Sequence, residues 1–154
     1  MSENLTLQLS KIIKASRSRT FEAWTRPEDL LHWFAPGPMK ATTIDVDLTV
    51  GGVFRWAMQG PSSRSGEMTQ VVYIGVFQEI VPDQLLKFSW QPEGNPSEDT
   101  LVTVTFADVE GGTEVMLTHE HIPSTDIYNR NKMGWGSMLD KLCGLIERVA
   151  ASVQ

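Results

Sequence analysis

The strongest constraint on the fold is an apolar stripe near the C-terminal end of the chain. Its members recur at spacings of four and three residues, which places side chains on one side of an α-helix: Trp135, Leu139, Leu142, Ile146 and Val149. Met138 and Leu145 widen the stripe. A single helix cannot shield such a stripe from water by itself. The rest of the chain must therefore supply an apolar surface for a long C-terminal helix.

Segments before this helix show the two-residue period of half-buried strands. They are residues 5–14, 42–48, 53–58, 68–81, 86–90, 101–109 and 113–121. Short turns join neighbouring strands, among them the glycine pairs at 51–52 and 111–112. Strands connected in this way pair into one antiparallel sheet, and we expect the long helix to pack across its concave apolar face.

Two short helices are expected between the first and second strands. Ser16 is a typical N-cap for a helix over residues 17–25, and Pro27 suits the first turn of a second helix. Pro36 ends that second helix, because proline cannot continue one. A further helical turn over residues 124–128 is expected before the long helix. These elements together predict an α+β fold class.

Length, charge and hydropathy exclude several kinds of protein. The chain has 154 residues, the usual size of one domain, so we expect a single domain over residues 1–154. Its net charge is -6 and it has no basic block, which argues against a nucleic-acid partner. It has neither a membrane-length apolar run nor a secretory start, so the expected location is the cytoplasm. The lone Cys143 is expected to be a small buried apolar side chain.

Five segments resemble, in order, the successive blocks of the family named for the activator of the Hsp90 ATPase. They read RTFEAWTRPEDLLHWF at 19–34, GGVFRW at 51–56, GVFQEIVPDQLLKFSW at 75–90, GTEVMLTH at 112–119 and GWGSMLDKL at 134–142. The resemblance implies the helix-grip fold of the START and Bet v 1-like superfamily, in which a sheet of six to seven strands curls around the last helix and leaves a cavity. It does not transfer chaperone activation, because one fold hosts unrelated functions.

The predicted ligand-binding residues are aromatic side chains and helix-stripe residues on the faces that the resemblance assigns to the cavity wall. They are Trp33, Phe54, Trp56, Phe88, Trp90, His119, His121, Trp135, Met138 and Leu142. Wide rings pack irregularly, so they can border a pocket as readily as fill a core. The alternative is therefore that these rings simply close the interior.

His119 and His121 lie two apart on a predicted strand, so both imidazoles are expected on the same face as Leu117. A zinc site would need further ligands, and only the distant Glu79 or Asp126 could supply them. We predict no metal and no cofactor. The histidines are instead expected to make a buried hydrogen bond, to reach solvent at the strand end, or to make a polar contact in the cavity.

Three functions compete. The first is binding of a small apolar or aromatic molecule in a cavity of about 300 Å³ or more, bordered by Trp56, Trp90, His119 and Trp135. The second is a chaperone ATPase accessory with an exposed apolar patch near Trp33, Phe34 and Met39. The third is a cyclase or aromatase-like enzyme using His119 and Arg55. The first is favoured, and a catalytic role is not. The expected state is a monomer or homodimer.

Overall fold

Seven strands form one antiparallel sheet in the computed structural model, which describes residues 4–62 and 65–152. The strands are β1 (Leu5–Ile13), β2 (Lys40–Val46), β3 (Val53–Pro61), β4 (Met68–Val81), β5 (Leu85–Pro92), β6 (Thr100–Val109) and β7 (Gly112–Ile122). They lie in the order β1-β7-β6-β5-β4-β3-β2, so β1 and β2 form the edges. The predicted antiparallel sheet is confirmed.

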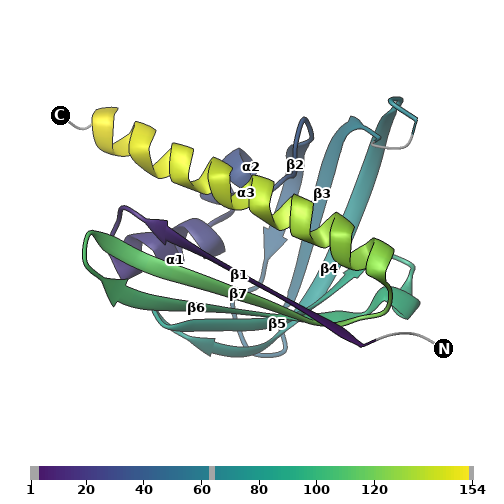
Figure 1. Ribbon diagram of the computed structural model, residues 1–154, viewed down its shortest axis with the longest axis horizontal. Helices are drawn as coiled ribbons and strands as arrows, with labels where there is room; N and C mark the ends of the chain where they lie inside the picture. The colour runs from purple at the N-terminus through teal and green to yellow at the C-terminus, as the bar shows by residue number, and fades with distance from the viewer. Residues whose placement is uncertain (1–3, 63–64, 153–154) are drawn as a thin grey trace.

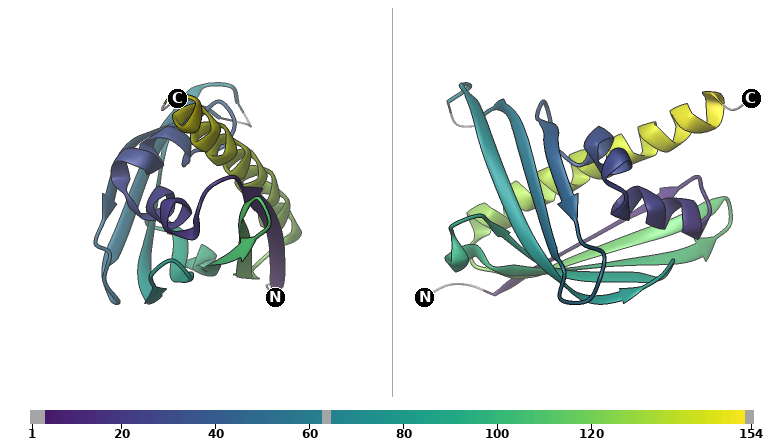
Figure 2. Two further views of the ribbon diagram at one scale, coloured as in Figure 1. Left: turned by 90° about the vertical axis from the view of Figure 1, so that its left-hand side faces the viewer. Right: turned by 180° about the vertical axis from the view of Figure 1, so that it is seen from behind.

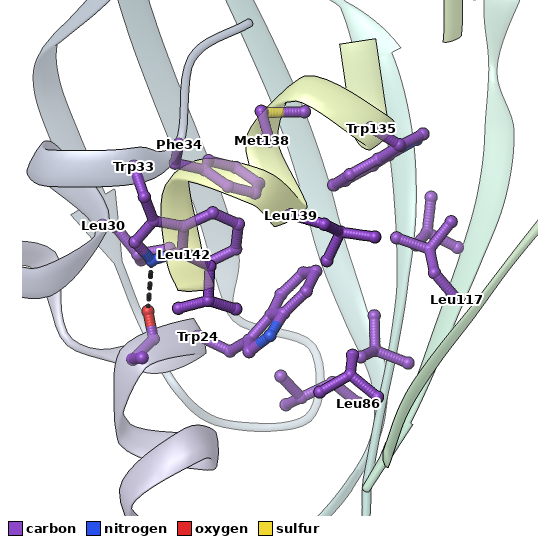
Figure 3. Close-up of a cluster of buried hydrophobic side chains, with 14 of the residues drawn as sticks. Trp24, Leu30, Trp33, Phe34, Leu86, Leu117, Trp135, Met138, Leu139 and Leu142 are labelled. Atoms are coloured by element: carbon purple, nitrogen blue, oxygen red, sulfur yellow. Dashed lines mark hydrogen bonds between the residues drawn. The ribbon is translucent and has the colours of Figure 1, made fainter. Parts of the chain in front are cut away.

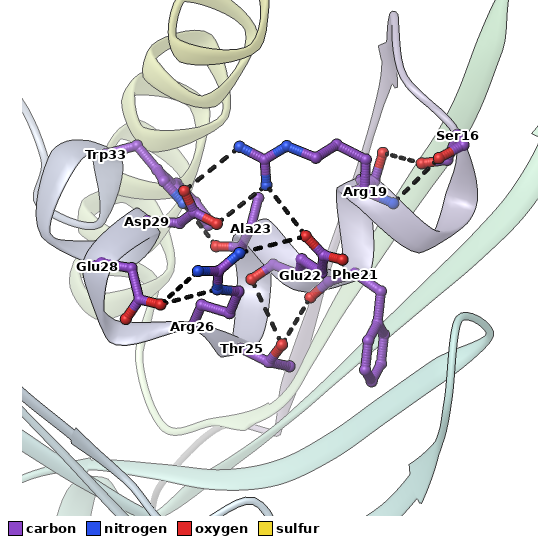
Figure 4. A network of polar contacts seen from close by, with 11 residues as sticks. Ser16, Arg19, Phe21, Glu22, Ala23, Thr25, Arg26, Glu28, Asp29 and Trp33 are labelled. Carbon is purple, nitrogen blue, oxygen red and sulfur yellow. Dashed lines mark hydrogen bonds and ion pairs between the residues drawn. The ribbon is translucent and has the colours of Figure 1, made fainter. Parts of the chain in front are cut away.

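Two short helices connect the edge strands β1 and β2, as the sequence predicts. They are α1 (Arg17–Thr25) and α2 (Pro27–Trp33). The Ser16 hydroxyl accepts a hydrogen bond from the backbone N–H of Arg19, which satisfies a free donor at the start of α1. Arg19 also reaches Asp29 in α2 with two bonds of 3.0 and 3.3 Å, and this pair fixes the angle between the helices (Figure 4).

One continuous helix, α3 (Thr125–Ser152), ends the described chain. The sequence predicts a separate helical turn over residues 124–128, but this turn is the first turn of α3. The Ser124 hydroxyl accepts from the backbone N–H of Ile127 and the Ser124 carbonyl accepts from Tyr128, so the helix continues from its cap without a break. A 3-10 turn, η1 (Pro96–Glu98), lies between β5 and β6.

The sheet bends around α3, which crosses its concave side while α1 and α2 lie beside it (Figures 1 and 2). The predicted stripe of α3 faces this concave side. Trp135, Met138, Leu139, Leu142, Leu145 and Ile146 are all buried. Figure 3 shows several of them meeting rings from the two short helices. The side chain of Val149, the last predicted member of the stripe, lies outside the described part of the chain.

Strand β2 is displaced from its predicted position. It begins at Lys40 and ends at Val46, whereas the sequence places Leu48 in line with Ile44 and Val46. Leu48 lies in the turn to β3 and is 39% exposed. The turn passes through Gly51 at a φ of 88°, which lies in the left-handed region that glycine adopts easily. Among the described helices none is both long and apolar enough to cross a membrane.

Gly75 lets two strands of the sheet approach closely, and a side chain there should break their pairing. A Cβ at this position would lie 2.0 Å from the backbone oxygen of Ser89 on β5. We expect Gly75→Ala to lower the free energy of unfolding by roughly 2 kcal/mol or more. Gly136, on α3, is the matched control, because nothing lies within 4 Å of a Cβ added there. Gly136→Ala should raise stability by about 0.5–1 kcal/mol through helix propensity. Urea unfolding of both variants measures the difference, and equal stabilities would contradict the close approach.

Candidate functional site

An aromatic row crosses three neighbouring strands on the concave side of the sheet. Trp56 on β3 pairs in register with Tyr73 on β4, and their ring centroids are 5.1 Å apart. Trp90 on β5 continues the row, with its centroid 4.9 Å from that of Tyr73 and 5.0 Å from that of Trp56. Residues on adjacent strands that point to the same face are brought into contact by the pleat, so the sheet itself builds this row.

Trp135 of α3 lies on the row and carries a buried chain of hydrogen bonds. Its centroid is 5.0 Å from that of Trp90, and its indole N–H donates to Nδ1 of His119 over 3.1 Å. Nε2 of His119 lies 2.7 Å from the hydroxyl of Thr100, which donates to the Trp90 carbonyl. Because an indole N–H can only donate, Nδ1 must accept, and the imidazole proton therefore sits on Nε2.

His119 is held in its neutral form by this environment. Its side chain is fully buried, and burial lowers its pKa from the ordinary 6.5 to about 4. A proton on Nδ1 would also face the Trp135 N–H and break that hydrogen bond. His119 thus acts as a hydrogen-bonding link between sheet and helix, which was one of the roles that the sequence left open.

Phe34, at the C-terminal end of α2, stands at the centre of a larger aromatic cluster. We define this cluster as the rings of Trp24, Trp33, Phe34, Phe54, Trp56, Tyr73, Phe77, Phe88, Trp90 and Trp135. Six of these rings lie with centroids 4.6–6.1 Å from that of Phe34: Trp24, Trp33, Phe54, Trp56, Trp90 and Trp135. Helices α1, α2 and α3 and the sheet therefore meet at one side chain.

A small void lies at the edge of the aromatic cluster, where α1 and α2 face the sheet. Its volume is about 10 Å³ and its walls are apolar or aromatic. They are formed by Trp24, Leu30, Phe34, Val46, Phe54, Phe77, Leu86 and Phe88. This volume is on the order of one water molecule.

The expectation of a preformed cavity of about 300 Å³ is wrong at the position that the sequence suggests. Trp56, Trp90, His119 and Trp135 were expected to border it, yet each is at most 4% exposed. Side chains beside a void of that size would present surface to it. The rings of the aromatic cluster fill this space instead, which is the alternative that the sequence allowed.

Two indole N–H groups in the aromatic cluster have no hydrogen-bond partner. They are Nε1 of Trp24 and Nε1 of Trp56, both fully shielded from solvent. Trp33, in contrast, donates to the Ala23 carbonyl over 2.9 Å (Figures 3 and 4). An unpaired buried donor destabilises a protein by about 1–3 kcal/mol, so two of them within one aromatic cluster are a costly feature of this core.

All but one of the predicted ligand-binding residues lie in this core. Trp33, Phe54, Trp56, Phe88, Trp90, His119, Trp135, Met138 and Leu142 are buried there. Only Phe54 and Phe88 of them border the void. Trp33 packs instead between α1 and α2, against Trp24. The sequence therefore predicted which residues lie in the interior. The void itself lies nearer to α1 and α2 than the sequence predicted.

The expectation that His121 shares a face with His119 is wrong. His121 has a φ of 65° and its side chain is exposed, with Nδ1 3.2 Å from Oδ1 of Asn4. The left-handed residue breaks the alternation of β7, so the next residue, Ile122, becomes the buried one. In the described part of the chain, no three His, Cys, Asp or Glu side chains gather as a metal site would require.

The list from sequence misses Trp24, Phe34 and Phe77, which also border the void. Phe34 carried a usable signal, because an aromatic residue at the end of a helix that packs on the core is brought to the inner edge of that helix. Thr100, the partner of His119, gave no signal, because it stands at the first position of its strand.

Arg55, the proposed partner of His119 in an enzyme, lies on the opposite face of the sheet. It is exposed and binds Glu93 on the surface, with Nε 2.9 Å from a carboxylate oxygen. Pairing with Glu93 raises the pKa of Arg55 and lowers that of Glu93. The fold thus separates Arg55 from the buried imidazole, and the two cannot act on one substrate.

A surface hollow of about 460 Å³ lies between α2 and α3. It is lined by His32, Ser137, Asp140, Lys141 and Gly144. Most of its polar groups serve the fold. The Lys141 ammonium donates to the carbonyls of Ala35 and Met39, and Ser137 accepts from the Gly37 N–H. These contacts tie the loop after α2 to the C-terminal helix.

Seven curved antiparallel strands around a long last helix, with short helices after the first strand, define a helix-grip fold of the Bet v 1-like type. The chain belongs to the family described as activator of Hsp90 ATPase homolog 1-like protein, whose sequence profile matches residues 14–147. The family resemblance is confirmed, and so is the implied arrangement of a sheet that curls around the last helix. A search of curated proteins finds no match.

Solved structures share this fold at low sequence identity. A protein from Chromobacterium violaceum has a TM-score of 0.80 and 23% identity, covering 92% of this chain and 96% of its own. A protein from Nitrosomonas europaea has a TM-score of 0.77 and 23% identity, covering 96% and 97%. The AHSA1 protein from Silicibacter pomeroyi has a TM-score of 0.79 and 19% identity, covering 93% and 98%. At these identities the likeness shows the fold alone.

The buried imidazole should make stability depend on pH. The unfolded chain takes up a proton on His119 near pH 6.5, while the folded chain does so only near pH 4. Stability should therefore be complete above about pH 6.5 and fall by about 3 kcal/mol as the pH drops to about 4. His119→Gln should lose this part of the pH dependence, and His121→Gln, which removes an exposed ring, should keep it. Urea unfolding across this range measures the slope, and equal slopes in both variants would refute the assignment.

Proposed function

We propose that this protein binds a small apolar or aromatic molecule between the sheet and its helices, at the aromatic cluster around Phe34. The observation that supports this is the void beside Phe34, which is also bordered by rings from α1, β3, β4 and β5. Ligand sites are mostly apolar, with a small number of polar groups that fix orientation. The aromatic cluster has this composition, and two of its few polar groups are the unpaired indole donors of Trp24 and Trp56.

The size of the void determines how such a ligand binds. A volume of about 10 Å³ holds at most one water molecule. A buried water needs two to four polar partners, and the walls offer only the Trp24 indole among apolar side chains. The void therefore favours apolar atoms over water. A larger guest enters only when a side chain moves, so we expect its affinity to include the free energy of that movement.

The most direct test is native mass spectrometry of the protein purified from its own host. We expect a co-purified small molecule, released on unfolding, with a predominantly apolar structure. The second readout is NMR of the five indole N–H groups during titration with indole as a probe. The signals of Trp24 and Trp56 should shift before that of Trp33, whose N–H is already bonded. No co-purified molecule, together with no shift at saturating indole, would remove the proposal.

A second candidate function is that of a chaperone accessory, which the family description suggests. The apolar patch was predicted near Trp33, Phe34 and Met39, and this is wrong, because the first two are buried and Met39 is partly buried. Exposed aliphatic side chains gather instead at the turn between β2 and β3 and on the outer face of β3 and β4. They are Leu48, Val50, Val53 and Val76, of which the last two pair in register.

The outer-face patch can be tested separately from the interior. We expect the double variant Val53→Thr and Val76→Thr to reduce any acceleration of the host chaperone's ATPase by about fivefold, because contacts at exposed apolar centres carry interface energy. Threonine keeps the strand geometry. Ile12→Thr is the control, since Ile12 is 53% exposed but lies on the opposite edge strand. An ATPase rate that the wild-type protein leaves unchanged would exclude this function.

A further inference from the structure

Phe34 differs from the other rings of the aromatic cluster in how it is held. Its backbone lies outside regular structure, at the end of α2 with φ -87° and ψ 56°. The loop that follows contains Pro36, Gly37 at a φ of 56°, and Pro38. Among the rings that surround Phe34, Trp56 and Trp90 are mounted on paired strands and Trp135 on the long helix. Phe34 can therefore leave the cluster without breaking a strand pair or a turn of α3.

The two unpaired donors both belong to rings in contact with Phe34. The centroid of Trp56 lies 4.6 Å from that of Phe34, and the centroid of Trp24 lies 6.1 Å from it. Nε1 of each is buried without an acceptor. Trp24 also borders the void, and in Figure 3 its indole nitrogen lies on the side of the ring that faces Leu86, another wall residue. A benzene ring such as that of Phe34 offers these donors no carbonyl or hydroxyl oxygen.

We propose that Phe34 is the chain's own occupant of the ligand site, and that the ligand is a ring-sized apolar molecule bearing a neutral carbonyl group. The ring of the ligand takes the place of the Phe34 side chain, and its carbonyl oxygen accepts a hydrogen bond from Trp24 or Trp56. This inference rests on the proposed binding function and specifies the ligand class of the same site.

Among the residues that the structure describes, the site has no free cation that could pair with a negatively charged ligand, so the hydrogen-bond acceptor on the ligand must be neutral. The aromatic cluster has no lysine or arginine among its members, and the cations of this region are engaged elsewhere. Arg19 is paired with Asp29, and Lys141 donates to backbone carbonyls. A carboxylate buried here would lose its hydration without gaining a counter-ion, which is strongly unfavourable. A ketone, aldehyde or ester offers an acceptor with no net charge and matches a group that can only donate.

The test uses two probes of the same shape, acetophenone and 2-phenylpropene, which differ by an oxygen in place of a CH₂ group. In Phe34→Ala the site is open, so acetophenone should bind at least about tenfold tighter than to the wild-type chain. The ratio of the two dissociation constants is then measured again after Trp24→Phe or Trp56→Phe in the same background. The ratio of the two dissociation constants is compared between variants. The different solubilities of the probes in water contribute equally to every ratio and therefore cancel.

We expect one of these tryptophan substitutions to shift the ratio against acetophenone by about fivefold or more, which identifies the donor. Trp33→Phe is the matched control and should leave the ratio unchanged, because Trp33 also touches Phe34 but its N–H already donates to Ala23. If Phe34→Ala does not fold, Phe34→Leu replaces it.

The outcomes separate this inference from the proposed function. If both probes bind Phe34→Ala and neither Trp24→Phe nor Trp56→Phe moves the ratio, the carbonyl specificity is overturned, while an apolar site remains. If neither probe binds the wild type, Phe34→Ala or Phe34→Leu, both the specificity and the binding function fail.

Discussion

The structure depends on the burial of one helix face against the inside of a bent sheet. The stripe of α3 is apolar over several turns, and only the concave face of the sheet is wide enough to cover it. Trp135 makes the central contact, because its ring packs against Trp90 and its indole N–H donates to His119 on β7. The packing and the hydrogen bond act at the same place. The helix therefore has a fixed rotation on the sheet as well as a fixed position, since other rotations would leave the His119 ring unpaired.

The interior has two parts, which differ in whether their buried polar groups have hydrogen-bond partners. On the β7 side, Trp135, His119 and Thr100 satisfy one another and end on a backbone carbonyl. On the side of the short helices, the indole groups of Trp24 and Trp56 are left without acceptors and a void remains. A core that served stability alone would gain by pairing these donors or replacing them with phenylalanine. The unsatisfied side is where a binding function is most consistent with the physical chemistry.

The sequence predicts the elements well because alternation and turn residues act locally. Strand alternation, the Ser16 cap and the helix stripe each depend on neighbours within a few positions, and all appear in the structure. The interior volume could not be predicted in the same way. It depends on how rings from five separate elements, α1, α2, β3, β5 and α3, meet at Phe34, and the local patterns do not fix the angles between those elements. The predicted face of His121 was wrong for a related reason. A single left-handed residue reverses the face of the residues that follow it in the strand.

The left-handed residue His121 also affects how α3 is rotated about its own axis relative to the sheet. By turning outward, His121 lets Ile122 close the inner face, and α3 begins three residues later at Thr125. Each residue advances an α-helix by about 100°. Loss of one residue from the first turn of α3 would thus rotate the rest of the stripe by more than a quarter turn relative to β7 and aim Trp135 away from the imidazole. The number of residues between His121 and Trp135 is therefore as much a part of the packing as the side chains of the stripe, because it sets which way the helix faces.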